Sequence, residues 1–280
     1  MSNEFLIKGV NIAKLPSDYG STGFKMFKGS ILNNVEIAYE TWGDLSINKD
    51  NVILLFTGLS PSSHAASSAE NQDKGWWEYM IGPNKPIDTN KYYVVCVNSL
   101  GSCFGSTSPA SLNKNNNSVY GLSFPELSIE DIAKAGHDAL QTLGIDHVHT
   151  VIGPSMGGMT AIAYALLFPS ALSNLVVISA AARTLPFTIS IRSLQRELIR
   201  SDPLWNKGNY NKETAPLNGM KLARKLGLMS YRAANEWRER FNRARIQKKE
   251  EKKMFDIEFE VESYLDHNSK KFVSMFDPNC

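Results

Sequence analysis

Cysteine is scarce in this sequence, with three residues in a chain of 280. Cys96, Cys103 and Cys280 have neither the number nor the spacing of a disulfide framework or of a zinc site. Such sparse cysteine is typical of a reducing compartment, so the expected location is the cytoplasm. No His/Cys/Asp cluster has the spacing of metal ligands, and we expect neither a metal nor an organic cofactor.

Long apolar runs and a charge excess of one sign are also missing. No stretch approaches the ~18 apolar residues of a membrane span, and residues 1–20 lack the apolar core of a signal peptide. The 30 basic residues nearly balance the 28 acidic ones, so the charge calls for neither a nucleic-acid nor a membrane partner. A small-molecule or peptide substrate fits better. A weak organelle-targeting signal stays open as an alternative.

The chain does contain enough hydrophobic sequence, 42% of its residues, for a sizeable core. From Val35 to about Ser179, short β-rich runs alternate with helical or loop segments, which predicts a mostly parallel sheet covered by helices. The predicted strands are residues 35–42, 51–58, 92–99, 149–154 and 175–181. The second and the last are apolar at consecutive positions, so we expect both to be central strands that are buried on both faces.

Two helical regions accompany these strands. Residues 128–143 predict a crossover helix with Ser128 as its N-cap and Gly144 as its stop. After Ala182 the sequence changes to long helical patterns rich in Arg, Lys, Glu and Leu. We therefore expect an α/β core over residues 1–182 and a helical lid over 183–280, in which the charged run 245–253 is a solvated helix face.

A catalytic motif lies between the last two predicted strands. Residues 153–157, Gly-Pro-Ser-Met-Gly, match G-x-S-x-G, follow an apolar strand and precede an apolar helical run that stops at Pro169. The glycines permit a strained turn that lifts the Ser155 hydroxyl above the sheet, and the Met156 N–H at the helix N-terminus can stabilise an oxyanion. We predict Ser155 as the nucleophile. The alternative is a structural or phosphate-binding turn.

A second oxyanion donor is expected from the loop after an earlier buried strand. Here the strand 51–58 runs directly into Leu59, whose backbone N–H is the candidate. The alternative is an ordinary loop at a strand end.

With these motifs the chain resembles the homoserine/serine O-acyltransferases (the MetX type), a family with the α/β-hydrolase fold. The resemblance runs from about Met26 to the last residue, and its most specific stretches are 75–83, 86–111, 124–132 and 153–169. It implies an α/β-hydrolase fold with a lid, and transfer of an acyl group from acyl-CoA to an amino-acid hydroxyl through an ester on Ser155. A lid that excludes water would protect that ester.

The resemblance also implies roles for particular residues. Arg196 would hold the amino-acid substrate, since a guanidinium can donate two parallel hydrogen bonds to a carboxylate, and Tyr231 would face the site. Three stretches, 57–68, 97–106 and 178–197, are most similar to the serine O-succinyltransferase branch, and Arg183 is our hypothesis for the partner of a succinyl carboxylate. The lid helices would form a homodimer. The loop that sets substrate specificity would be Gly58, Leu59, Ser60 and Pro61.

The family mechanism also needs an aspartate and a histidine that follow the serine. We expect the closing strands, the aspartate and the Gly-His-Asp segment to be absent, because the chain stops where the lid ends. His137 precedes Ser155 in the crossover helix, and His267 has only the adjacent Asp266 to orient it. A feeble catalyst with poor solubility or a tendency to oligomerise is the expectation. The histidines considered are His64, His137, His147, His149 and His267.

Three functions stay open. The favoured one, because Ser155 and Arg196 are present, is transfer of a succinyl or acetyl group to L-serine or L-homoserine in cysteine or methionine biosynthesis. The second is a non-catalytic relative that acts as a binding or partner subunit. The third is an esterase or hydrolase of the same fold, which the stretches 75–78 and 98–103 disfavour.

Overall fold

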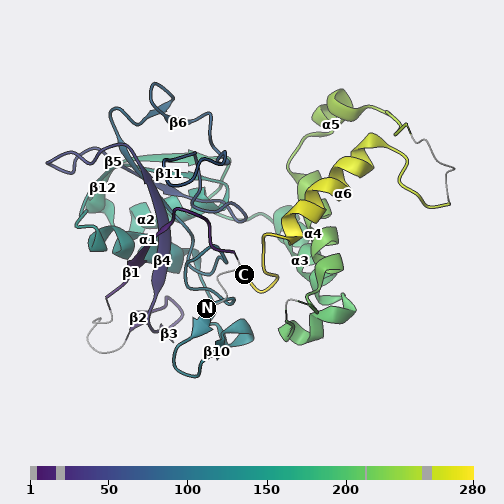
Figure 1. Cartoon of the computed structure of the whole chain (residues 1–280), viewed down its shortest axis with the longest axis horizontal. Helices are drawn as coiled ribbons and strands as arrows, with labels where there is room; N and C mark the ends of the chain where they lie inside the picture. The colour runs from purple at the N-terminus through teal and green to yellow at the C-terminus, as the bar shows by residue number, and fades with distance from the viewer. Residues whose placement is uncertain (1–4, 17–22, 212, 248–253) are drawn as a thin grey trace. The chain divides into compact units, whose positions relative to one another are not determined.

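The computed structural model describes residues 5–16, 23–211, 213–247 and 254–280. The chain divides into two compact units, Met1–Arg183 with Cys280 and Thr184–Asn279. The first unit is built around one large sheet and the second consists of helices and their connections (Figure 1).

The α/β unit has a six-stranded sheet in the order β1-β4-β8-β5-β11-β12. Strands β8, β5, β11 and β12 run parallel, whereas β4 is antiparallel to both of its neighbours. Each of the five predicted strands overlaps a strand of the sheet, but β12 begins and ends three residues earlier than predicted. Strand β1 was not predicted, because only one of its four residues is buried and it carries no apolar run. The bounds are Asn11–Lys14 (β1), Glu36–Trp42 (β4), Val52–Phe56 (β5), Tyr93–Val97 (β8), Val148–Pro154 (β11) and Leu172–Ile178 (β12).

Six strands of two residues form three small ribbons outside this sheet. They are Phe24–Lys25 (β2) with Ile31–Leu32 (β3), Ile81–Gly82 (β6) with Ile87–Asp88 (β7), and Leu112–Asn113 (β9) with Ser118–Val119 (β10).

The prediction of two central strands is confirmed for β5 and wrong for β12. All five residues of β5 are buried, and the strand lies between β8 and β11. In the described sheet β12 is an edge strand, and its apolar side chains Leu175, Val176 and Val177 are 41%, 41% and 36% exposed. An apolar run shows that a strand is suited to burial on both faces, but it does not supply the neighbours that would bury it.

The two faces of the sheet have different covers. One face packs against helices α1, Ile129–Thr142, and α2, Met156–Leu167, in a core that includes Leu54, Val95 and Tyr164. The other face packs against the loop that follows β5, including Ala65, Ala66, Trp76 and Trp77. This second cover carries the segment that leads to the candidate site.

Helix α1 begins as the sequence predicts. The Ser128 hydroxyl accepts a hydrogen bond from the Asp131 backbone N–H, and Asp131 accepts one in return from the Ser128 N–H, a reciprocal capping box. The other carboxylate oxygen of Asp131 accepts from the Phe27 N–H at 2.6 Å, which ties the helix start to a distant loop. Gly144, at φ +66°, follows the helix end.

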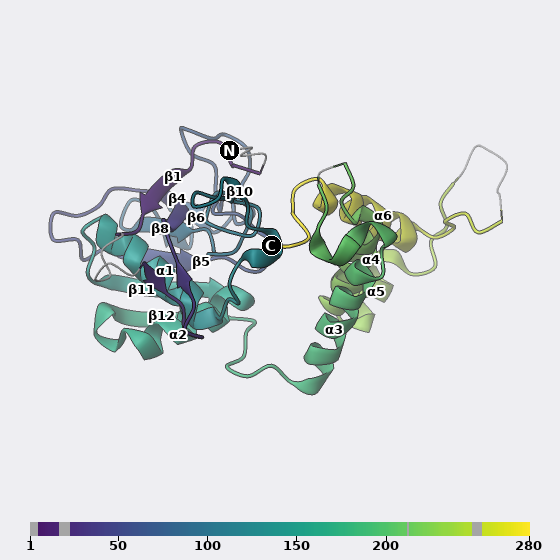
Figure 2. The same cartoon turned by 90° about the horizontal axis from the view of Figure 1, so that it is seen from below.

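The second unit contains four α-helices in the described residues: α3, Pro186–Arg200; α4, Leu217–Ser230; α5, Ala234–Phe241; and α6, Glu260–Val273. Helix α4 packs against both α3 and α6 (Figure 2). Across both units, the described residues also form three short 3-10 helices, at Gly121–Ser123, Pro169–Ala171 and Pro203–Gly208. No helix in the described ranges is long and apolar enough to cross a membrane.

The predicted solvated helix over 245–253 is wrong where the structure describes it. Arg245 forms an isolated antiparallel bridge with Phe259, and residues 246 and 247 are not helical. Residues 248–253 lie outside the described residues. The backbone bond between Ile246 N–H and Glu258 C=O shows that tertiary pairing prevails over the helical propensity of this charged run.

Candidate active site

Ser155 lies at the sharp turn between β11 and α2. Its backbone has φ 56° and ψ −123°, a conformation that L-residues rarely adopt and that costs of order 1–3 kcal/mol. The turn is held by hydrogen bonds from Ser155 N–H to the Ile178 carbonyl at 2.9 Å and from Gly158 N–H to the Ser155 carbonyl at 2.9 Å. Ser155 is exposed, and its hydroxyl forms no hydrogen bond with another described residue. The strained turn therefore presents the hydroxyl to solvent.

Two glycines of the motif are required by close backbone approach. A Cβ on Gly153 would lie 2.0 Å from the Gly157 carbonyl oxygen, and a Cβ on Gly157 would lie 2.4 Å from the Phe56 carbonyl oxygen. The second contact packs the start of α2 directly against the end of β5. The absence of side chains at Gly153 and Gly157 therefore allows the Ser155 turn to pack closely against the end of β5, where the loop begins.

The loop after β5 approaches the serine. A Cβ on Gly58 would lie 3.9 Å from the Ser155 Cβ and 3.7 Å from the Pro154 carbonyl oxygen. Leu59 follows directly, with 51% of its surface exposed. Met156 is the first residue of α2, and N–H groups in a first helical turn have no partner inside their helix. Leu59 thus follows the glycine that approaches Ser155, and Met156 is the next residue after the serine.

The histidines of the α/β unit are engaged elsewhere. His137 stacks on Phe168 at 3.8 Å between ring centroids, and its Nδ1 lies 3.2 Å from the Tyr164 hydroxyl. Burial lowers the pKa of His137. His147 and His149 contact Ser173 and Thr150. None of these side chains forms a hydrogen bond with Ser155 in the described residues.

The residues assigned to substrate binding lie on the helical unit, except Arg183 at the end of the α/β unit. Arg196 is exposed on α3 and forms no hydrogen bond or ion pair with another described residue. Tyr231 caps α4 and is 52% exposed. A Cβ on Gly227 would lie 2.7 Å from the Gln195 Nε2 and 3.5 Å from the Tyr231 hydroxyl, so Tyr231 lies beside the residue that precedes Arg196. In the same unit, the carboxylate of Asp266 pairs with Lys225 and Lys270 rather than with His267.

Comparisons with known proteins agree with this geometry. The model of the α/β-hydrolase fold family matches residues 51–274. The serine O-succinyltransferase of Litchfieldella anticariensis is 53% identical over 257 residues, which are 91% of this chain and 70% of that protein. The crystal structure of homoserine O-acetyltransferase from Bacillus anthracis has a TM-score of 0.83 at 28% identity, and covers 98% of this chain and 74% of its own. The chain belongs to the homoserine/serine O-acyltransferase family.

Esterases share the architecture. The crystal structure of esterase E22 has a TM-score of 0.83 at 29% identity, with 98% of this chain and 75% of that chain covered. The same fold is therefore shared by proteins named as esterases and as homoserine O-acetyltransferases.

Sequence reasoning missed two acidic side chains that hold the loop after β5 in this acyltransferase. The Glu78 carboxylate accepts hydrogen bonds from the Ser67 N–H at 2.8 Å and the Gly75 N–H at 3.2 Å, and it pairs with Lys85. The Ser67 N–H is the main cause that lowers the pKa of Glu78 to about 2. The other is Glu40 on β4, 3% exposed, which contacts His64. A charged residue inside an apolar strand pattern was the available signal for Glu40.

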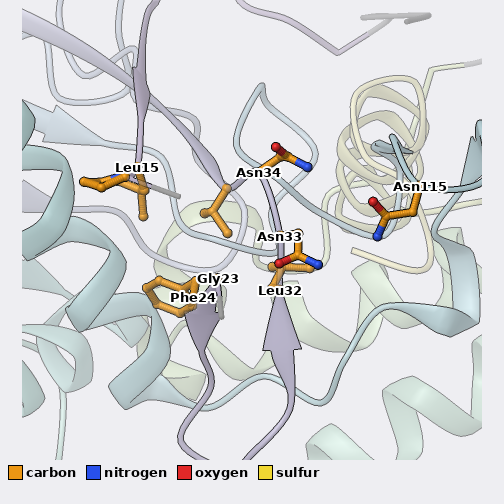
Figure 3. A pocket seen from close by; sticks show the side chains of 9 residues that line it. Leu15, Gly23, Phe24, Leu32, Asn33, Asn34 and Asn115 are labelled. Carbon is orange, nitrogen blue, oxygen red and sulfur yellow. The ribbon is translucent and has the colours of Figure 1, made fainter. Parts of the chain in front are cut away.

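A separate pocket of about 240 Å³ borders β2 and β3 (Figure 3). The side chains of Leu15 and Phe24 give it apolar walls, and the amides of Asn33 and Asn115 give it polar ones. None of its lining residues is among the predicted site residues. In the described part of the chain, no three His, Cys, Asp or Glu side chains are grouped so as to hold a metal ion.

Proposed function

We propose that this acyltransferase moves a succinyl group from succinyl-CoA to the hydroxyl of L-serine through an ester on Ser155. The Ser155 oxygen attacks the thioester carbonyl, the carbon–sulfur bond breaks, and the thiol of CoA leaves with a proton. The hydroxyl of L-serine then attacks the ester and restores Ser155. The observation that carries the proposal is the strained Ser155 turn in a chain that is 53% identical to a serine O-succinyltransferase.

We assign the backbone N–H groups of Leu59 and Met156 to the first step. In the tetrahedral intermediate the carbonyl oxygen becomes an anion, and donors on Leu59 and Met156 would stabilise it. The dipole of α2, with its N-terminus at Met156, adds to the same effect. Loss of one such donor typically lowers kcat on the order of 10²- to 10³-fold.

The substrate carboxylates call for cations, and Arg196 and Arg183 are proposed for them. Arg196 would bind the carboxylate of the amino acid, and Arg183 the free carboxylate of the succinyl group. Arg183→Leu is expected to reduce turnover with succinyl-CoA far more than with acetyl-CoA. An equal loss with both donors would refute the role of Arg183.

The assay for the whole proposal measures products for both donors and both acceptors. Succinyl-CoA and acetyl-CoA are each supplied with L-serine, with L-homoserine or with no acceptor, and CoA release and O-acyl amino acids are quantified by mass spectrometry. O-succinylserine as the main product is expected. O-acetylhomoserine as the main product would replace the proposed substrates, since a structural relative is a homoserine O-acetyltransferase.

An esterase is the second candidate, because esterase E22 matches this chain with a TM-score of 0.83. It predicts CoA release and free acid at the same rate with and without an amino acid. Acyl transfer predicts that L-serine accelerates CoA release and captures the acyl group.

The proposal extends to cofactor, assembly and location. We propose that acyl-CoA is a co-substrate and that no metal or organic cofactor is needed. We also propose that the protein forms a homodimer through its lid helices. Its proposed location is the cytoplasm, and its proposed pathway is cysteine or methionine biosynthesis. Dialysis against EDTA is expected to leave activity unchanged, and light scattering is expected to give twice the mass of one chain. A loss of activity after dialysis that zinc restores would contradict the first expectation.

A further inference from the structure

His64 and Glu40 form a buried ionisable pair behind the loop that flanks Ser155. His64 is 8% exposed and Glu40 3% exposed. The His64 Nδ1 lies 2.8 Å from the Glu40 Oε2, and the His64 Nε2 lies 2.8 Å from the backbone carbonyl oxygen of Asp73. Both ring nitrogens are therefore within hydrogen-bond distance of an oxygen.

The proton count of this pair follows from its partners. A backbone carbonyl oxygen only accepts hydrogen bonds, and a carboxylate only accepts them as well. Two hydrogen bonds at 2.8 Å therefore require either an imidazolium with the Glu40 carboxylate or a neutral imidazole with a protonated Glu40. In both cases the pair holds one proton more than a neutral imidazole with a carboxylate.

The surroundings of His64 and Glu40 favour the state of the pair that holds the additional proton. Burial lowers the pKa of His64, but the bonds and charges of Glu40 and Asp73 raise it by more, so the pKa lies above its usual value. Cys96 on β8 lies opposite Glu40 in the strand register and is fully buried. Burial is the main cause that raises the pKa of this thiol, so Cys96 adds no charge at neutral pH. The amide of Asn71, 3.5 Å from the His64 Nδ1, is neutral.

The pair also fixes the far end of the loop. The Ser63 hydroxyl donates to the Glu40 Oε1 at 3.0 Å, so both carboxylate oxygens bind residues 63 and 64. The indole N–H of Trp76 donates to the Ser62 carbonyl at 2.9 Å. At its other end, the loop begins after Phe56, the last residue of β5, whose backbone packs against Gly157. Residues 58–61 thus span two fixed points.

We propose that the protonated Glu40–His64 pair is a latch that positions the loop Gly58–Pro61 beside Ser155, and that alkaline pH releases the loop by removing the proton. A group whose pKa is raised on folding stabilises the fold below its unfolded value, and that contribution is lost as the pH rises through the folded value. Loss of the proton sets the Nδ1 lone pair against the Glu40 carboxylate. His64 is a positioning residue that acts through the loop backbone.

The protonation state is tested by NMR of protein labelled at histidine. The His64 signal is assigned by its loss in His64→Asn. A protonated ring that titrates above the ordinary histidine range near 6.5 is expected in the wild type. In Glu40→Gln the amide can donate to Nδ1 and still accept from Ser63, so a neutral ring with a proton on Nε2 is expected. A His64 ring that titrates as an exposed histidine does would overturn the proposal.

The link to the loop is tested by hydrogen exchange and by the reaction of Ser155. Amide protection over residues 57–68 is expected to fall between about pH 7 and pH 9 in the wild type and to stay constant in Glu40→Gln, after correction for the intrinsic rate. The rate of Ser155 acylation by a p-nitrophenyl ester is measured at pH 9 and divided by the rate at pH 7. This ratio is expected to be roughly tenfold lower in the wild type than in Glu40→Gln. His147→Asn, which changes an exposed histidine on the same unit, should follow the wild type.

Each result decides the proposal. Equal protection at both pH values, or identical pH profiles for the wild type and Glu40→Gln, would show that the pair is structural only. The acylation readout rests on the proposed function, whereas NMR and exchange do not. If Ser155 takes up no acyl group in any variant, the proposed function fails while the latch is still tested.

Discussion

At the residue scale, the turn that carries Ser155 depends on backbone positions that tolerate no Cβ. The six atoms most closely approached by a Cβ at Gly153 or Gly157, three for each position, are all backbone atoms, which cannot rotate away as a flexible side chain can. The G-x-S-x-G pattern therefore reports a steric requirement, and that is why a five-residue motif could predict the turn. The φ of 56° at Ser155 is the backbone strain that this packing sustains.

Gly157→Ala is expected to destabilise the α/β unit and to abolish reaction at Ser155. The added Cβ would meet the Phe56 carbonyl oxygen at 2.4 Å, so α2 must move away from β5, at a cost of about 1–3 kcal/mol. Urea unfolding and acylation of Ser155 measure the two effects. Gly58→Ala is the matched control for stability, since its Cβ finds only contacts of 3.7 Å or more. Equal stability of the two variants would contradict the steric account.

Glu78→Gln is expected to reduce stability by about 1–3 kcal/mol at pH 7, because a charged acceptor of two backbone N–H groups is lost. The pKa of Glu78 is lowered to about 2, so its contribution is complete above its unfolded value near 4.5 and is lost as the pH falls toward 2. Urea unfolding of both proteins should therefore show a difference at pH 7 that shrinks at pH 3.

The control for Glu78 is Glu126→Gln, which removes a carboxylate that is 72% exposed and pairs with Lys28. Exposed pairs contribute little, so this change should alter stability by less than about 1 kcal/mol. A pH-independent difference between wild type and Glu78→Gln would show that the loop is held by packing instead.

At the scale of single elements, the strands and helices that carry a strong period were predictable. The apolar run of β5 and the Ser128 cap of α1 both appear in the structure as the sequence indicates. Strand β1 was missed because three of its four residues are exposed. The prediction that β12 is a central strand was wrong because the sequence of one strand does not show which strands pair with it. The Glu40–His64 pair joins residues 24 positions apart, which no local pattern reveals.

The start of α1 offers a graded test of capping. Ser128→Ala removes one cap and is expected to cost about 1 kcal/mol. Asp131→Ala removes the reciprocal cap and the acceptor of the Phe27 N–H, and Asp131 is 1% exposed, so a larger loss is expected. Thermal unfolding of both variants measures the order. A larger loss for Ser128→Ala would contradict the tertiary role of Asp131.

At the scale of the whole molecule, the chain combines an α/β unit that carries the proposed nucleophile Ser155 with a helical unit that carries two residues proposed to bind the substrate. The fold and the strained turn at Ser155 could be predicted from motif and period, whereas the roles proposed for Arg183, Arg196 and Tyr231 come from family resemblance. Exposed arginines have the same local sequence appearance whether or not they bind a ligand.

At high protein concentration, association beyond the proposed dimer is expected through β12, which exposes three apolar side chains at a sheet edge. Val176→Lys should lower the concentration-dependent mass measured by light scattering. Ser173→Lys adds the same charge to the same strand without removing an apolar side chain, and should have a smaller effect. No difference between the two variants would show that charge, rather than the apolar surface, controls association.

The most direct test of the acyltransferase account is the intact mass of the protein after brief exposure to succinyl-CoA, with Ser155→Ala treated in parallel. A single succinyl adduct that maps to Ser155, is absent from Ser155→Ala and disappears when L-serine is added is the predicted result. An adduct of equal yield in Ser155→Ala, or an ester on Ser155 that L-serine does not discharge, would contradict the account.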